Sequence, residues 1–246
     1  ITGLALATVQ VASTVGNSAV AASVAESAVS VAGRISQGNP AAAAAIAERA
    51  VTVAERVLPM NPSAAVRIAA TAVQSVAATQ VSQSAPQRTM ETITIAARIV
   101  VAPAAQAIDP VGVAGISVAA TRVASNPAVY QSNPQAAITA MANAHAAATS
   151  QTVTAAAPNA GATVVSTLNQ VSANNALTQS NPNNASQVSA ILAGQVPATT
   201  QEAPTQSTTT TSTTTSATNQ NTTNTPPPPT SPVVVEENPI FTGSAT

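Results

Sequence analysis

The stretch "NPAAAAAIAERAVTVAERVLPMNP", residues 39–62, begins and ends with the same dipeptide, Asn39-Pro40 and Asn61-Pro62. An Asn side chain accepts hydrogen bonds from the free N–H groups at a helix start, and Pro suits the first helical position because its backbone angle is preset and it has no N–H. The residues between the two pairs are rich in Ala and Val. We therefore expect one helix that begins at Pro40, and a second that begins at Pro62.

The same punctuation recurs along the chain. Prolines that follow Asn, Asp or Ala mark a regular series: Pro40, Pro62, Pro86, Pro110, Pro134, Pro158 and Pro182. The first interval, from Pro40 to Pro62, is slightly shorter than the five that follow, which are all equal. The shorter interval, counted back from Pro40, leads to Asn17-Ser18. We expect an N-cap and a first helical residue at Asn39-Pro40, Asn61-Pro62, Asp109-Pro110, Asn133-Pro134 and Asn181-Pro182. A constant interval of this length is typical of solenoids and other repeat arrays.

Within each interval, apolar residues recur at the three-four spacing of a helical face, as in Ile46, Ala50 and Val53. The helices should end shortly before Pro103, Pro127 and Pro197, because the residue before Pro disfavours helical angles. One further apolar residue often follows in the connector. We expect it to fill the joint between neighbouring helices at Val81, Val129, Val153 and Leu177.

These patterns predict an all-α protein, an α-solenoid of about eight single-helix repeats of 22–24 residues with an extended Thr/Pro-rich C-terminal tail. Ala at the contact positions would let neighbouring helix axes approach closely. A parallel β-helix is the alternative, since Val, Ile and Thr favour strands. The abundance of Ala and the scarcity of Gly favour helices over that alternative.

The domain boundaries follow from the end of the repeats. We expect an N-terminal helix or segment over residues 1–17, the helical repeats over 18–200, a Thr/Ser/Pro-rich linker over 201–232, and an apolar docking segment over 233–246. Residues 1–14 are either the first helix of the mature chain, which the polar Thr2, Thr8 and Gln10 favour, or the remnant of a signal peptide.

The C-terminal tail carries two kinds of candidate site. Its Thr-rich part is either a plain linker or a glycosylated stalk, with candidate acceptors at Asn221, Thr208, Thr209 and Thr210. The apolar residues beyond it are candidate assembly residues that could dock onto another subunit: Val233, Val234, Val235, Ile240 and Phe241. A terminus without a role is the alternative for this segment.

The composition argues against most chemistry. Charged residues make up 6 % of the chain and Lys is absent, against about 25 % in a typical domain. The few Arg and the two aromatic residues, Tyr130 and Phe241, disfavour nucleic-acid binding. Without Cys and with one His, His145, the chain offers no expected metal, cofactor or catalytic site, and we expect no enzyme. No apolar run is long enough to span a membrane.

The charged residues show one regularity. Glu26 and Glu48 occupy equivalent positions in consecutive repeats, and so do Arg34 and Arg56. They are candidate assembly residues that could form charge ladders between stacked helices or ion pairs between subunits. Two solvated charge pairs of little energetic weight are the alternative.

The repeats over about residues 17–200 resemble the Ala/Val-rich, Asn-Pro-punctuated helical repeats of uncharacterised exported bacterial proteins. That resemblance brings no known active site with it. A near-neutral Ser/Thr/Asn surface favours association, so we expect a structural protein that self-assembles into an extracellular filament, sheath or surface layer. The alternatives are a cell-surface scaffold or adhesin that binds a peptide or glycan, and an ice-binding protein.

Overall fold

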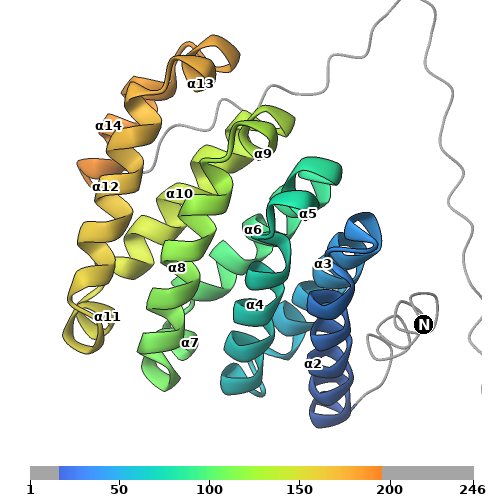
Figure 1. The fold of residues 1–246 in the computed structure, drawn as a ribbon. Coiled ribbons are helices and arrows are strands. Elements are labelled where there is room, and N and C mark those ends of the chain that lie inside the picture. Colours follow the sequence, from blue (N-terminus) through green and yellow to red (C-terminus); the bar gives the residue numbers. More distant parts are fainter. Residues whose placement is uncertain (1–16, 196–246) are drawn as a thin grey trace, which may run out of the picture. The chain divides into compact units, whose positions relative to one another are not determined.

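The computed structural model describes residues 17–195, and in that range the chain is entirely helical, with thirteen helices and no strand (Figure 1). The expectation of an all-α protein is therefore confirmed, and a parallel β-helix is excluded for this range. The chain divides into two compact units, Ile1–Gln201 and Glu202–Thr246, and every described residue lies in the first.

Eight longer helices form the body of the described region. They are α2 (Ser18–Ile35), α3 (Pro40–Val57), α4 (Pro62–Val76), α6 (Pro86–Val101), α8 (Pro110–Ala124), α10 (Pro134–Ala148), α12 (Asn159–Ala173) and α14 (Asn184–Leu192). Each packs against the next two longer helices in the chain: α2 contacts α3 and α4, α3 contacts α4 and α6, and so on to α12 and α14. Contacts in this region are thus made mainly between near neighbours.

Five helices of six residues lie in the connectors, at α5 (Thr79–Ser84), α7 (Pro103–Ile108), α9 (Pro127–Ser132), α11 (Gln151–Ala156) and α13 (Asn175–Ser180). The expected single-helix repeat is therefore wrong from Pro62 onwards. The two shorter units, which begin at Ser18 and Pro40, each have one helix of 18 residues and a turn. The five units that begin at Pro62, Pro86, Pro110, Pro134 and Pro158 instead have a longer helix and a short one, which explains the change of interval.

The short helices alternate between two edges of the molecule. Figure 1 shows α5, α9 and α13 along one edge and α7 and α11 along the other, and α9 contacts both α5 and α13 while α11 contacts α7. Pro103 and Pro127 come after the ends of α6 and α8, as expected, but they also begin α7 and α9. Each short helix buries an apolar residue completely, at Val81, Ala105, Val129, Val153 and Leu177.

The Asn-Pro and Asp-Pro pairs cap helices at four of the five expected positions. The side chains of Asn39, Asn61, Asp109 and Asn133 each accept a hydrogen bond from the backbone N–H three residues later. Asn17 caps α2 in the same manner. The prediction for Asn181-Pro182 is wrong, because α14 begins at Asn184 and the Asn181 amide is used elsewhere.

The core consists of Ala, Val and Ile on the facing sides of the longer helices, with Ile46, Ala50 and Val53 almost fully buried. Such small side chains leave the helix backbones close together. Gly112 lies in a tightly packed place at the start of α8. A Cβ atom there would lie 2.3 Å from Asp109 Oδ2 and 2.9 Å from Val66 Cγ1, so the start of α8 accepts only glycine without rearrangement.

Candidate interaction surfaces

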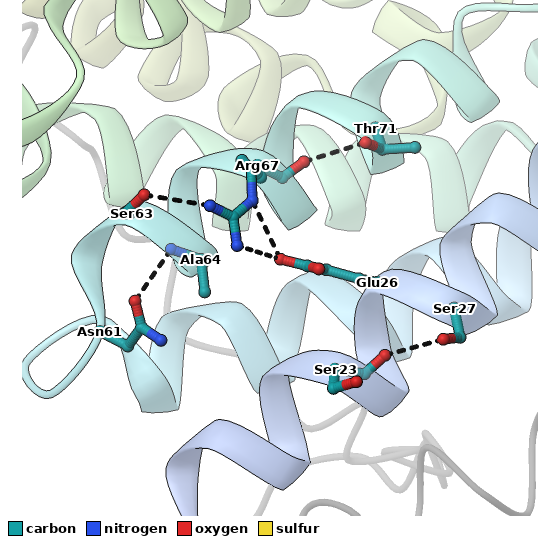
Figure 2. A network of polar contacts seen from close by, with 8 residues as sticks. All are labelled: Ser23, Glu26, Ser27, Asn61, Ser63, Ala64, Arg67 and Thr71. Carbon is teal, nitrogen blue, oxygen red and sulfur yellow. Dashed lines mark hydrogen bonds and ion pairs between the residues drawn. The ribbon is translucent and has the colours of Figure 1, made fainter.

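Ion pairs join longer helices that are two apart in the chain. The guanidinium of Arg67 on α4 donates through Nε and Nη2 to Glu26 Oε1 on α2, at 3.1 and 2.7 Å (Figure 2). Arg67 also donates through Nη1 to Ser63 Oγ at 3.2 Å, one turn earlier on α4. The pair lies at the surface, with the two side chains 59 % and 36 % exposed, so it contributes at most about 1 kcal/mol.

Two further pairs join α3 to α6. Arg88 Nη1 donates to Glu48 Oε2 at 2.6 Å, and Arg98 donates through Nε and Nη2 to the two carboxylate oxygens of Glu55 at 2.6 and 3.0 Å. The hydrogen bond to Glu55 raises the pKa of Arg98 above its ordinary value. The bidentate geometry fixes the relative register of the two helices.

Glu91 lies close to the first of these pairs. Partial burial raises the pKa of Glu91, the charge of Glu48 and a hydrogen bond to Glu48 raise it further, and the nearby Arg88 lowers it. Two carboxyl groups thus share one side of a groove between α3, α6 and α10, of about 530 Å³. Arg98, Ser132 and Asn133 also line that groove, together with the apolar Met90, Ile95 and Ala136, so its surface is of mixed polarity.

The ladder expected for Glu26, Glu48, Arg34 and Arg56 takes a different form. The acidic members do join stacked helices, but their partners are Arg67 and Arg88 in the same chain. Arg34 and Arg56 are exposed in the last turns of α2 and α3. The assembly role of these four residues stays a prediction.

Sequence reasoning missed a buried polar cluster around Tyr130, the single aromatic residue in the described range. Tyr130 on α9 is completely buried. Its hydroxyl donates to Asn184 Oδ1 at 2.9 Å and accepts from Asn181 Nδ2 at 3.0 Å. Asn184 Nδ2 in turn donates to the Val171 carbonyl at 2.7 Å. This cluster fastens the start of α14 to α9 and to the end of α12, and burial raises the pKa of Tyr130.

The lone histidine belongs to no metal cluster in the described range. His145 is partly buried on α10, and that burial lowers the pKa of its imidazole below the ordinary value. Among residues 17–195, no three His, Cys, Asp or Glu side chains lie close enough together to hold a metal ion.

An apolar groove of about 660 Å³ runs along the outer face of α8. Its floor is a stripe of small side chains on successive turns, Val111, Gly115 and Val118, and Val111 is 60 % exposed. The walls come from the end of α4 at Ala77, from α5 at Ser82 and from the residues around the start of α12, Ala157 and Ala160. Ala114, Ala119 and Val123 of α8 complete the lining. Arg122 and Asn126 lie at the far end of the groove.

Formal charge is confined to the first part of the described region. All of its Asp, Glu and Arg residues lie between Glu26 and Arg122, and none occurs from Val123 to Gln195. The exposed side chains of α12 and α14 are therefore small or neutral and polar, as at Asn159, Ser166, Asn169, Gln170, Ser186 and Ser189. The helical region therefore presents a surface without formal charge from Val123 to Gln195.

The remaining candidates lie outside the described residues. These are the candidate assembly residues Val233, Val234, Val235, Ile240 and Phe241, and the candidate glycosylation sites Asn221, Thr208, Thr209 and Thr210. Their roles stay predictions.

The helices of the described region include none with the length and apolar character needed to cross a membrane. Comparisons with family models, with curated proteins and with solved structures gave no significant match.

Proposed function

We propose that this chain is a non-enzymatic α-solenoid that self-assembles into an extracellular filament, sheath or surface layer. The solenoid is supported by the packing of each longer helix on the next two and by the regular interval of the helix starts. The extracellular location rests on the low charge and on the exported proteins that the repeats resemble.

The uncharged surface from Val123 to Gln195 is the observation that carries self-assembly. Like charges keep protein surfaces apart, and a surface without them associates more readily. The outer face of α12 combines this neutrality with short polar side chains such as Ser166 and Asn169. These side chains lose little conformational entropy when they are ordered at a contact.

The test introduces negative charge on the exposed face of α12 in the full chain. We expect Asn159→Glu with Gln170→Glu to shift the wild-type assemblies toward monomers, because the added carboxylates must be desolvated or repel one another at the contact. The matched control is Gln74→Glu with Gln80→Glu, which adds the same charge at exposed positions of α4 and α5. Negative-stain electron microscopy and sedimentation velocity measure the outcome. A wild-type chain that stays monodisperse and monomeric at high concentration would contradict the proposal.

The second candidate function is a cell-surface scaffold or adhesin that holds a peptide or a glycan. The groove of mixed polarity between α3, α6 and α10 favours it, since Glu91, Arg98 and Asn133 offer donors and acceptors on one surface. A monomer that binds an oligosaccharide on a glycan array, and loses that binding in Asn133→Ala, would favour this candidate over self-assembly.

A further inference from the structure

The groove along α8 has apolar side chains on a helix face that is open to solvent. Val111, Gly115 and Val118 follow one another on its outer face at three-four spacing, where polar side chains normally occur. Val111 is 60 % exposed and the groove walls are mostly Ala. An apolar stripe bounded by walls on both sides fits an extended segment better than a flat protein surface.

A charged residue at the far end of the groove restricts which segment can bind there. Arg122 is exposed there, and it is the last charged residue of the helical region. An occupant that matches the whole groove must therefore be apolar over one part and acidic next to it.

One segment of the chain outside the described residues has this pattern. Val233, Val234 and Val235 are followed directly by Glu236 and Glu237. The acidic residues beyond Gln195 are these two and Glu202, which has no such apolar run beside it. Charge and polarity thus select residues 233–237 as the complementary segment.

The lengths agree as well. From Val111 to Arg122 the α8 axis rises about 17 Å, at ~1.5 Å per residue. From Val233 to Glu237 an extended chain rises about 13 Å, at ~3.3 Å per residue, and the long side chains of Glu237 and Arg122 span the difference. With the valines over Val111, Gly115 and Val118, the two glutamates reach Arg122.

We propose that the groove along α8 binds residues Val233–Glu237 of a second copy of this chain. The inference rests on the proposed self-assembly and names the contact that links one copy to the next. Residues 196–232 separate the helical region from this segment, and fully extended they span more than about 100 Å. That reach suffices for the groove of a neighbouring copy.

The absence of Cys from the sequence permits a direct test. One full-length chain carries Gly115→Cys, and a second, of different mass because of a tag, carries Val234→Cys. A Cβ atom at Gly115 meets nothing within 4 Å, so the substitution leaves the groove open. Mixed under mild oxidation, the two chains form more of the mixed disulfide than random collision gives when the segment of one copy binds in the groove of the other. The control replaces Gly115→Cys with Gly38→Cys, where a Cβ atom likewise meets nothing within 4 Å.

We expect at least about fivefold more linked heterodimer with Gly115→Cys than with Gly38→Cys, because docking raises the local concentration of the thiol. Adding Arg122→Glu to the Gly115→Cys chain should reduce linkage to the control level. Adding Glu236→Arg and Glu237→Arg to the partner chain should then restore it.

Equal linkage at Gly115→Cys and Gly38→Cys would overturn the inference. A chain with both Gly115→Cys and Val234→Cys that links only within itself would overturn it too, because the occupant would then be the chain's own segment. If wild-type assemblies persist in either case, self-assembly stands without this contact. If the wild-type chain is monomeric and no linkage occurs, both proposals fail.

Discussion

Glu91 is the carboxyl group in the described region whose protonation is most clearly linked to folding. Burial and the nearby Glu48 raise its pKa in the folded chain above the ordinary value of 4.5. The folded state therefore binds the proton of Glu91 more tightly than the unfolded state does. This preference stabilises the fold at pH values below 4.5, and the stabilisation is lost as the pH rises through the pKa of Glu91 in the folded chain. At pH 7 the carboxylates of Glu91 and Glu48 repel each other beside Arg88.

Glu91→Gln is therefore expected to stabilise the fold at pH 7 and to have little effect at pH 3.5. Because the side chain is exposed, the gain should stay below about 1 kcal/mol, or about 2–4 °C in midpoint. Thermal unfolding followed by far-UV circular dichroism at both pH values measures it. The matched control is Glu55→Gln, which breaks the pair with Arg98 and should lower the midpoint at pH 7. A loss of stability in Glu91→Gln at pH 7 would contradict the assignment.

At the level of single helices, α6 begins after Ala85, whereas α3, α4, α8 and α10 begin after an Asn or Asp whose side chain caps the helix. Ala85 has backbone angles of φ −140° and ψ 58°, close to the −145° and 74° of Asn61, yet it offers no side-chain acceptor to α6. The backbone is thus already arranged for a cap that the side chain does not provide.

We expect Ala85→Asn to stabilise the fold by about 0.5–2 kcal/mol, because the new amide can accept from the backbone N–H of Arg88. The reciprocal variant, Asn61→Ala, should lose a similar amount, since it removes the bond to the Ala64 N–H. Urea unfolding at equilibrium gives both free energies. If Ala85→Asn destabilises the chain while Asn61→Ala does so too, burial at position 85 outweighs the cap.

The helix starts and the buried faces were predictable from sequence because both depend on local chemistry. An Asn or Asp before Pro satisfies free N–H groups, and apolar residues at three-four spacing define a face. The six-residue helices were missed because they are shorter than two turns and give no such spacing. The sequence pattern therefore predicts only a helix end before Pro103, although a proline that follows one helix can also begin another.

The contacts between helices were less predictable. Glu26 and Arg67 are 41 residues apart, and no local pattern indicates which of several Arg residues Glu26 will meet. Tyr130 is a weak signal as a lone aromatic residue, but its partner Asn181 has the pattern of a helix start and nothing in the sequence marks Asn184. The apolar stripe on α8 was hidden because Val111 and Val118 resemble core positions until the neighbouring helices are placed.

For the whole helical region, packing between near neighbours has a consequence for cooperativity. In an array where each unit contacts only its neighbours, a destabilising substitution lowers the stability of its own unit and the adjacent units first. The Tyr130 cluster holds α14 at one end of the region, and the Glu26–Arg67 pair joins α2 and α4 at the other. The two sites belong to helices that do not pack on one another, so they can be perturbed separately.

Tyr130→Phe should leave the amides of Asn181 and Asn184 without their buried partner, at a cost of about 1–3 kcal/mol. We expect native-state hydrogen exchange, measured by mass spectrometry, to become faster in α13 and α14 and to stay unchanged in α2 and α3, because opening of one end does not require opening of the other. Glu26→Gln is the reciprocal variant. It should make hydrogen exchange faster in α2 and leave the exchange rate of α14 unchanged. Equal acceleration in all helices after Tyr130→Phe would mean that the region opens as one unit, which contradicts an array stabilised by its neighbours.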